Sequence, residues 1–144
     1  MQNTNSLTAI ILTLNEEELL PHCLDSLNWV SDKLVIDSGS TDRTCEIAVE
    51  HGARLVYRSF DDYASQRNAS LDETKSDWVF FVDADEIISV ELAKSISDVI
   101  EHNTEVGWLI PRYNYIFGKI IMHAGWFPDY QLRLFRRNLG YYSH

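Results

Sequence analysis

The chain has 144 residues, of which 45% are hydrophobic and 12% aromatic, so it is long and apolar enough to bury the core of one domain, which excludes intrinsic disorder. Its 12 basic and 22 acidic side chains give a formal charge of −10, the wrong sign for affinity to nucleic-acid phosphates. Residues 1–105 hold 7 basic and 21 acidic side chains (−14), whereas 106–144 hold 5 basic and 1 acidic (+4). The cationic tail is either an ordinary solvated face or a surface for an anionic acceptor or lipid headgroups.

Short apolar runs alternate with amphipathic stretches through the first two thirds of the chain. Residues 7–14 are apolar and rich in β-branched side chains, which predicts a buried strand that ends in a polar loop. Leucines and Cys23 then recur at helical spacing and predict a helix through about residue 27. The same signals predict further strands at 33–37, 53–57 and 78–82, and helices up to His51 (with Gly52 as its stop), at 63–71 and at 90–102.

Four strands that alternate with helices predict an α/β fold, because right-handed crossovers place such strands parallel in one sheet with helices on both faces. Beyond Gly107 the pattern changes, and residues 108–115, 117–123 and 130–135 are predicted as strands of a mixed or antiparallel extension. The overall expectation is a mostly parallel sheet flanked by helices, followed by this C-terminal extension.

The two cysteines, Cys23 and Cys45, lie on apolar faces of predicted helices, where a free thiol serves as a small hydrophobic side chain. The N-terminus lacks the basic region of a secretory signal, and the uncharged apolar stretches are shorter than the roughly 20 residues that span a bilayer. We therefore expect a cytoplasmic protein without a disulfide framework.

Polar clusters follow three of the predicted parallel strands. They occupy residues 13–16 (TLNE), 37–40 (DSGS) and 83–85 (DAD). The carboxyl edge of an open α/β sheet is where ligands bind. A single such cluster is commonly a helix cap or a loop anchor, but three at one edge favour a binding site.

Asp83 and Asp85 form the sharpest of these patterns, because carboxylates two residues apart at a strand end project to the same side and repel each other unless a cation is near. A hard divalent cation such as Mg²⁺ uses about one or two protein carboxylates and takes its other ligands from phosphates and water. The pair therefore predicts a metal–diphosphate site. The alternative is that Asp83 caps the next helix while Asp85 and Glu86 are solvated. Neither G-x-G-x-x-G nor a P-loop pattern occurs, which disfavours dinucleotide oxidoreductases and P-loop NTPases.

Four motifs, in this order, resemble the family 2 glycosyltransferases, which have the Rossmann-like GT-A fold. They are TLNEE at 13–17, VIDSGSTD at 35–42, QRN at 66–68 and FVDADE at 81–86. Within that family, CLDSL at 23–27 and GWFPDYQLRLFRR at 125–137 are similar to bacterial lipopolysaccharide-core glucosyltransferases. The resemblance covers nearly the whole chain.

The resemblance implies a site for a UDP-sugar and a divalent cation, Mg²⁺ or Mn²⁺. The residues that it implies for this site are Thr13, Asn15 and Glu16 in the nucleotide pocket, Asp37 on the base, Arg67 near the base and phosphates, Asp83 on the ribose or the metal, and Asp85 on the metal. An aspartate can accept the uracil N3–H, which agrees with a UDP donor. The sequence departs from the family at position 15, where several relatives have a base-stacking aromatic residue instead of Asn15.

The implied reaction is transfer of a sugar, glucose in the similar enzymes, from UDP to an acceptor hydroxyl with inversion. A base must deprotonate that hydroxyl, and Asp129 is the only carboxylate after Glu105; it is either this base or a loop carboxylate that pairs with Arg133 or Arg136. The aromatic residues and arginines of the tail fit a phosphorylated sugar on a lipid, and equally fit a packed extension with surface arginines.

We divide the chain into a donor-binding region, residues 1–105, and a partial acceptor-side extension of the same domain, residues 106–144. The chain ends before family members complete the acceptor side, so we expect a truncated chain. The leading hypothesis is a metal-dependent transferase that acts on a lipopolysaccharide-core or other anionic glycan or glycolipid, peripherally at the inner face of the membrane. The alternatives are a nucleotide-sugar-binding module without turnover, and a metal-dependent phosphohydrolase that leaves the upstream motifs unexplained.

Overall fold

The computed structural model describes residues 6–102, 107–112, 114–116, 119–121 and 129–137, with side chains for 6–102 and 133–137. The first eight elements, in chain order, are β1 (Leu7–Thr13), α1 (Leu20–Asp25), β2 (Asp32–Asp37), α2 (Thr44–Glu50), β3 (Arg54–Tyr57), α3 (Tyr63–Asp72), β4 (Trp78–Asp83) and α4 (Val90–His102). The strands that follow are β5 (Gly107–Arg112), β6 (Asn114–Ile116), β7 (Lys119–Ile121) and β8 (Asp129–Arg136).

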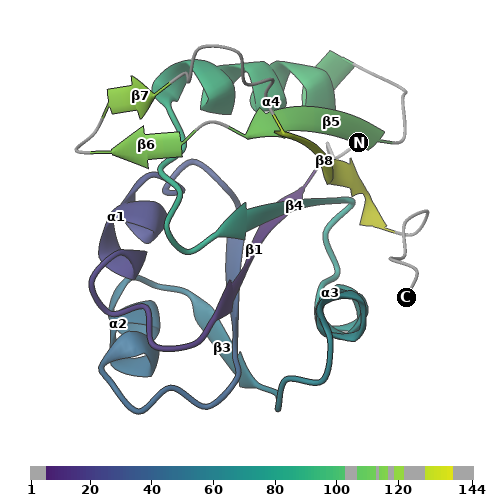
Figure 1. The fold of residues 1–144 in the computed structure, drawn as a ribbon. Helices are drawn as coiled ribbons and strands as arrows, with labels where there is room; N and C mark the ends of the chain where they lie inside the picture. Colours follow the sequence, from purple (N-terminus) through teal and green to yellow (C-terminus); the bar gives the residue numbers. More distant parts are fainter. Residues whose placement is uncertain (1–5, 103–106, 113, 117–118, 122–128, 138–144) are drawn as a thin grey trace.

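Six of the described strands form one sheet, in the order β3-β2-β1-β4-β8-β5 (Figure 1). Strands β3, β2, β1 and β4 run parallel, whereas β8 is antiparallel to both β4 and β5. The predicted α/β fold, with a mostly parallel sheet and an antiparallel C-terminal extension, is confirmed. The prediction of one strand over 108–115 is wrong, because β5 pairs with β8 while β6 pairs with β7 in a separate hairpin.

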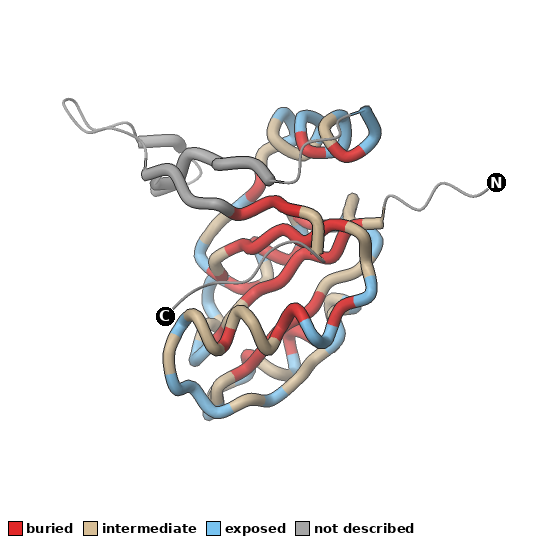
Figure 2. Tube along the Cα trace, turned by 90° about the vertical axis from the view of Figure 1, so that its right-hand side faces the viewer, coloured by how far each residue is buried: buried red, intermediate tan, exposed pale blue. Residues whose placement is uncertain are grey.

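The central strands are apolar on both faces, as expected for parallel strands that are covered by helices on both sides. On β4, Phe80 and Val82 belong to one hydrophobic cluster and Val79 and Phe81 to another, because successive strand residues point to opposite faces. Figure 2 shows that the buried residues concentrate along these strands. The sheet therefore separates two hydrophobic cores.

Helices cover both faces of the sheet, as predicted. Cys23 of α1, Ile47 of α2 and Ile96 of α4 belong to the larger cluster, whereas Leu71 of α3 belongs to the smaller one on the opposite face. Figure 1 shows α1 and α2 on one side of the strands and α3 on the other. The larger core is thus shared by three helices, and α3 packs on the other face.

Local signals in the sequence explain where two of these helices begin and end. Asp62 caps α3, because its carboxylate accepts a hydrogen bond from the backbone N–H of Ser65 at 2.8 Å. Gly52 follows α2 with a φ of 78°, the left-handed conformation that favours glycine just beyond a helix. Both ends agree with the prediction to within a residue or two.

The carboxyl ends of three parallel strands lie side by side. Thr13 pairs with Asp37 in the ladder between β1 and β2, and Leu12 pairs with Asp83 in the ladder between β1 and β4. The three polar clusters of the sequence therefore meet at one edge of the sheet. In the described residues no helix is long and apolar enough to cross a membrane, and Cys23 and Cys45 are free thiols.

Candidate functional site

Asp37, at the end of β2, is a buried anchor for the loop that follows it. The residue is only 2% exposed. Its carboxylate accepts hydrogen bonds from the Thr13 hydroxyl at 2.8 Å, the Ser40 hydroxyl at 2.6 Å, and the backbone N–H groups of Gly39 at 2.9 Å and Ser40 at 2.8 Å. Burial opposes ionisation, but these hydrogen bonds outweigh it and lower the pKa of Asp37. Gly39 turns the loop with a φ of 114°, which a side chain would strain.

The loop after β1 is tied to the loop after β2 through Asn15. Asn15 has a φ of 54°, a left-handed conformation that is uncommon outside glycine but most accessible to asparagine and aspartate. Its backbone N–H donates to the Ser40 hydroxyl at 2.8 Å, and its side-chain oxygen accepts from the Thr41 N–H at 2.8 Å. The next residue, Glu16, donates its N–H to the Thr44 hydroxyl at 2.8 Å. The two loops therefore form one hydrogen-bonded unit.

The acidic motif after β4 forms a closed turn. The backbone N–H of Glu86 donates to the carbonyl of Asp83 at 2.9 Å, and the N–H of Asp83 donates to the Glu86 carboxylate at 2.7 Å. Helix α1 supports the turn from behind, since the Cys23 thiol donates to the Asp83 carbonyl at 3.5 Å and the Ser26 hydroxyl accepts from the N–H of Ile88 at 2.9 Å. The backbone of residues 83–88 is thus held at both ends.

Arg133 of β8 lies against this turn. Its side chain is 5% exposed, and its guanidinium pairs with the carboxylates of Asp83 (3.3 Å) and Glu86 and donates to the carbonyl of Phe81 at 3.4 Å. Burial disfavours the charge, but Glu86 and Asp83 together raise the pKa of Arg133. Both alternatives for the tail arginines, a surface for acceptor phosphates and a solvated surface, are therefore wrong for Arg133, because its charge is buried against the acidic motif.

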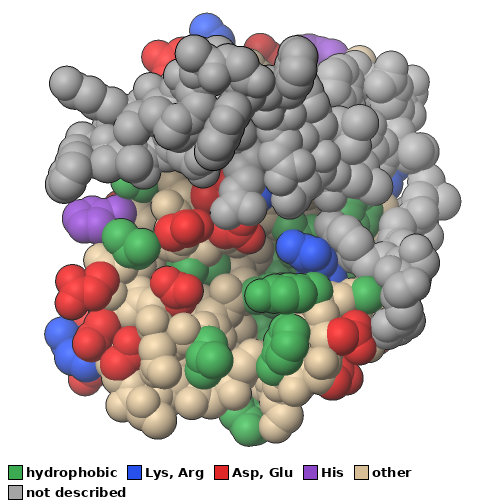
Figure 3. Space-filling view, viewed as in Figure 1, with side chains coloured by type: hydrophobic (Ala, Val, Ile, Leu, Met, Phe, Trp, Pro, Cys, Tyr) green, Lys and Arg blue, Asp and Glu red, His purple; other side chains and the backbone are tan. Residues whose placement is uncertain are grey.

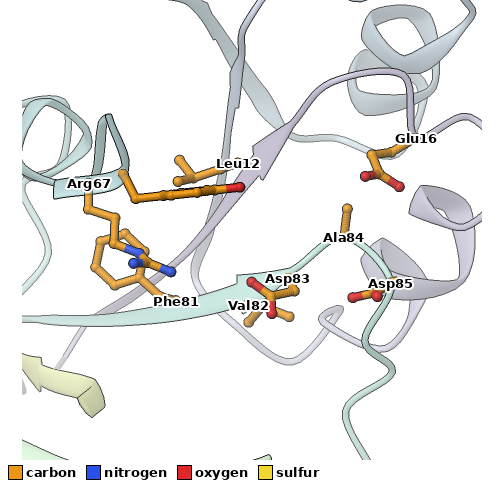
Figure 4. A pocket seen from close by; sticks show the side chains of 9 residues that line it. Leu12, Glu16, Arg67, Phe81, Val82, Asp83, Ala84 and Asp85 are labelled. Atoms are coloured by element: carbon orange, nitrogen blue, oxygen red, sulfur yellow. The ribbon is translucent and has the colours of Figure 1, made fainter. Parts of the chain in front are cut away.

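A cavity of about 400 Å³ opens at this edge of the sheet. Its lining brings together the carboxylates of Glu16, Asp83 and Asp85 and the guanidinium of Arg67. Figure 4 shows Arg67 at one end of the cavity and Glu16 and Asp85 at the other. Burial and the negative charges of Asp85, Asp42 and Asp83 raise the pKa of Glu16. The Glu16 carboxylate is therefore repelled by the other carboxylates of this edge.

A second cavity, of about 280 Å³, adjoins the first and shares Leu12, Glu16 and Tyr63 with it. Two aromatic rings line it, those of Phe60 and Tyr63, with centroids 5.0 Å apart and planes at 71°. Its polar side chains are Thr13, Ser38 and Gln66, besides Glu16 at its rim. On the face seen in Figure 3, acidic side chains and hydrophobic side chains gather around a hollow near the centre.

Ser38 is held in place by its neighbour on α3. The Gln66 amide nitrogen donates to the Ser38 hydroxyl and to the carbonyl of Arg58, both at 3.1 Å. Gln66 itself is fully buried. Because the Ser38 oxygen accepts this bond, its own hydroxyl proton is directed elsewhere and can be donated to a ligand.

The structure separates the predicted site residues into groups. Glu16, Arg67, Asp83 and Asp85 line the larger cavity, and Thr13 lines the smaller one. Asn15 and Asp37 line neither cavity and instead hold the loops together. Asp129 is the first residue of β8 and pairs with Arg112 of β5, while its side chain lies outside the described residues.

Sequence reasoning included Ser38 and Gln66 in its motifs without giving them a role, and it missed Phe60 and Tyr63, which also line the smaller cavity. One signal was available: Tyr63 precedes Arg67 by four residues on a predicted helix, so both side chains share a helix face. The Arg67 guanidinium lies 5.7 Å from the centroid of the Tyr63 ring and 5.9 Å from that of Phe81. No local signal marks Phe60 as a neighbour of this pair.

The donor set of the larger cavity fits a hard divalent cation that binds together with phosphates. In the part of the chain that the structure describes, no three carboxylate, imidazole or thiol side chains form a preformed metal cage. Mg²⁺ binds in this manner, through about one or two carboxylates and the oxygens of a substrate phosphate. Asp85 is exposed and lines the cavity, so it meets this requirement without rearrangement.

The profile of the family "Glycosyl transferase family 2" matches residues 8–142. The chain belongs to this family. Among curated proteins it is similar to the lipopolysaccharide core biosynthesis glycosyltransferase LpsC of Rhizobium meliloti, with 33% identity over 95% of this chain and 53% of that protein. It is also 35% identical, over 69% of this chain and 33% of the relative, to an uncharacterised glycosyltransferase of Rickettsia bellii.

Solved structures of glycosyltransferases share the fold of this family 2 chain. Glucosyl-3-phosphoglycerate synthase from Mycobacterium tuberculosis, in complex with Mn²⁺, UDP and glucosyl-3-phosphoglycerate, superposes with a TM-score of 0.60 and 27% identity over 71% of this chain and 42% of that one. Residues 1–349 of TarS from S. aureus superpose with a TM-score of 0.55 and 25% identity over 67% of this chain and 33% of that one. The predicted GT-A fold is confirmed, and the chain spans about half or less of the length of these relatives.

Proposed function

We propose that this chain binds a UDP-sugar together with a divalent cation. It would belong to an enzyme that transfers the sugar, which we expect to be glucose, to a lipopolysaccharide-core or related glycan. One observation carries the proposal: the larger cavity sets Asp85, Asp83 and Glu16 opposite the guanidinium of Arg67. A diphosphate with a bound cation needs such a combination, because the carboxylates hold the cation and the guanidinium binds phosphate oxygens. The synthase complex with UDP and Mn²⁺ supports the same ligands.

Asp85 is the residue that we assign to the metal, Mg²⁺ or Mn²⁺. It is exposed at the cavity, whereas the carboxylate of Asp83 already pairs with Arg133 at 3.3 Å. When bound, the cation would act as a Lewis acid that stabilises the charge on the departing UDP. Arg67, at the other end of the cavity, would bind the phosphate oxygens. For Asp83, which keeps its contact with Arg133, we propose a bond to the ribose or a weaker contact with the metal.

The smaller cavity fits a nucleobase. Its two aromatic rings offer the stacking surface that Asn15 does not supply, and the Ser38 hydroxyl offers a hydrogen bond to a base edge. Asp37 lies beneath this cavity, bonded to Thr13 and to the loop at Ser40. We therefore propose that Asp37 shapes the base pocket through Thr13 and the loop.

The acceptor side is assigned to residues 106–144 and the donor side to residues 1–105. Asp129 is our candidate for the base that takes the proton of the acceptor hydroxyl. One positive charge of residues 106–144, that of Arg133, is buried against Asp83 and Glu86. The remaining 4 − 1 = +3 favours an anionic glycan or glycolipid as acceptor, and contact with the inner face of the membrane, over a neutral sugar.

A ligand panel tests the donor assignment. Unfolding midpoints are measured with UDP, GDP or CDP, each with and without Mn²⁺ or Mg²⁺. UDP with a cation should stabilise the chain more than either alone, by about 2.7 kcal/mol at a hundredfold excess over Kd. Asp98→Asn, an exposed change on α4 that lines neither cavity, is the matched control for Asp85→Asn. Absence of any uridine-specific shift would refute the assignment.

Release of UDP from UDP-glucose in the presence of a lipopolysaccharide-core acceptor tests turnover. Transfer by the chain that is lost in Asp129→Asn, with UDP binding intact, would support Asp129 as the base. Binding of UDP and Mn²⁺ without transfer would instead favour the alternative function, a nucleotide-sugar-binding module.

A further inference from the structure

Arg133 occupies an unusual position for a charged side chain, since it is buried on a strand that is far in sequence from the acidic motif. The ladder pairs Phe80 with Leu134, so Arg133 lies beside Phe81 on the neighbouring strand. Phe81 and Asp83 point to the same face of β4 because they are two residues apart. Arg133 is thereby directed along that face toward Asp83.

The guanidinium holds the turn through two carboxylates at once. It pairs with Asp83 at 3.3 Å and with Glu86, and the same Glu86 carboxylate accepts the backbone N–H of Asp83 at 2.7 Å. The side chain of Glu86 is only 14% exposed and that of Asp83 is 36% exposed. A planar guanidinium can bind two carboxylates in a fixed geometry, which the compact ammonium of lysine does less well.

We propose that Arg133 is a positioning residue for metal binding: by clamping Asp83 and Glu86 it fixes the turn from which Asp85 projects into the larger cavity. The inference rests on the proposed function and assigns to β8 a part in the donor site, although β8 lies outside the four motifs to which the donor residues belong. Arg133 does not touch the ligand. It acts through the turn, as the groups that orient metal ligands generally do.

Charge and geometry make opposite predictions for the Arg133→Met variant. Loss of a positive charge beside the carboxylates would tighten the binding of Mn²⁺ by Coulomb attraction alone. Loss of the clamp would weaken it, because removal of a group that orients a metal ligand typically costs about 10-fold to 100-fold in affinity. The sign of the change therefore separates a local field from a positioning role.

The double variant Arg133→Met with Glu86→Gln keeps the net charge of the wild type and still offers an acceptor to the N–H of Asp83. Replacement of both partners of a buried ion pair is also tolerated better than removal of one. We therefore use it to keep the fold while the clamp is lost. Arg133→Lys serves as the conservative variant and should recover part of the affinity.

The experiment measures the UDP affinity of each variant by calorimetry over a Mn²⁺ titration, with the unfolding midpoint recorded in parallel. We expect the Mn²⁺ concentration for half-maximal UDP affinity to rise about 10-fold or more in the double variant, with Arg133→Lys between it and the wild type. Arg136→Met is the matched control on the same strand, since Arg136 packs over Trp78 at 4.7 Å; it should lower stability without shifting the Mn²⁺ dependence.

Two outcomes overturn the inference. An unchanged Mn²⁺ dependence in a folded double variant would show that Arg133 only stabilises the sheet, and tighter Mn²⁺ binding by Arg133→Met would show that it acts through charge. A wild-type chain that binds no UDP with Mn²⁺ would instead refute the proposed function, so the two failures are distinguishable.

Discussion

Asp37 and Asp85 lie at the same edge of the sheet, yet their surroundings are opposite. The carboxylate of Asp37 is buried and accepts hydrogen bonds from Thr13, Gly39 and Ser40. Asp85 is exposed, lines the larger cavity, and receives no hydrogen bond from the described residues. The oxygens of Asp37 are therefore used within the chain, whereas those of Asp85 face the cavity.

The same contrast extends to the segments that carry the two residues. The loops after β1 and β2 are bonded to each other through Asn15 and Glu16, so the chain itself satisfies their polar groups. In the turn after β4, the backbone is held from behind by Cys23 and Ser26 while Asp85 remains open to the cavity. The loops after β1 and β2 therefore fix the shape of the site, whereas the turn after β4 presents a carboxylate to it.

The largest expected effect is on stability, in Asp37→Asn. One carboxylate oxygen of Asp37 accepts from the hydroxyls of Thr13 and Ser40 and the other from the N–H groups of Gly39 and Ser40. The amide keeps an acceptor for only one of these two pairs and loses the charge that strengthens both. We expect the free energy of unfolding at pH 7 to fall by roughly 3 kcal/mol. Denaturant unfolding measures this change. Retention of full stability would show that Asp37 does not anchor the loops and would remove the contrast with Asp85.

The next effect, in Asp85→Asn, is on binding and leaves the fold intact. Loss of the carboxylate should raise the Mn²⁺ requirement for UDP binding by about 10-fold to 100-fold, while an exposed substitution changes the free energy of unfolding by less than about 0.5 kcal/mol. Calorimetric titration and denaturant unfolding of the same sample test both parts. A Mn²⁺ requirement equal to that of Asp98→Asn would leave Asp85 as a solvated surface residue.

A smaller effect on stability is expected in Asn15→Ala, because alanine in the left-handed conformation is strained and loses the bond from Thr41. The expected loss is about 1 to 2 kcal/mol. Asn15→Gly removes the same side-chain hydrogen bond but is not strained in the left-handed conformation, so it should lower the free energy of unfolding by less than Asn15→Ala. Equal destabilisation by the two variants in thermal unfolding would contradict the role of the backbone conformation.

The smallest expected effect is on stability in Glu16→Gln, and its dependence on pH distinguishes Glu16 from Asp37. The pKa of Glu16 is raised in the fold, so its ionised form is unfavourable and the folded chain loses stability as the pH rises through that pKa. Glu16→Gln should therefore be more stable than the wild type at pH 7, by less than about 1 kcal/mol because solvent screens the charges. The advantage should vanish on acidification below the ordinary pKa of a glutamate.

The pH dependence of the contribution of Asp37 to stability has the opposite sign. Its pKa is lowered in the fold, so its contribution is complete above the ordinary pKa of an aspartate and is lost as the pH falls through the lowered value. The penalty of Asp37→Asn should thus persist at pH values where the advantage of Glu16→Gln has already disappeared. Unfolding series over acidic pH compare the two variants with the wild type.

Much of the fold could be predicted because its information is local. Runs such as 78–82 are apolar throughout and end in polar residues, and this pattern predicts β4 and the edge at which Asp83 lies. The partner of a strand is not local information. Residues 108–115 show one apolar pattern but contribute to two strands, because β5 pairs with β8 whereas β6 pairs with β7.

The candidate site shows the same limit at the level of single residues. Motif order predicted that Glu16, Arg67, Asp83 and Asp85 would meet, and they do line one cavity. It did not predict the burial of Arg133, which depends on the antiparallel register between β4 and β8. Nor did it find Phe60 and Tyr63, because their neighbourhood depends on how α3 packs against the sheet.

The pairing of β8 with β4 also has a consequence for the order in which the chain folds. During synthesis, β1 to β4 are complete before β8 exists, and until then β4 presents one unpaired edge of a strand that reads Trp-Val-Phe-Phe-Val. Unpaired, apolar strand edges are templates for pairing with other chains. β8 closes this edge and carries Arg133 and Arg136. Protection of this edge from aggregation and completion of the acidic motif therefore arrive in a single step, when β8 pairs with β4.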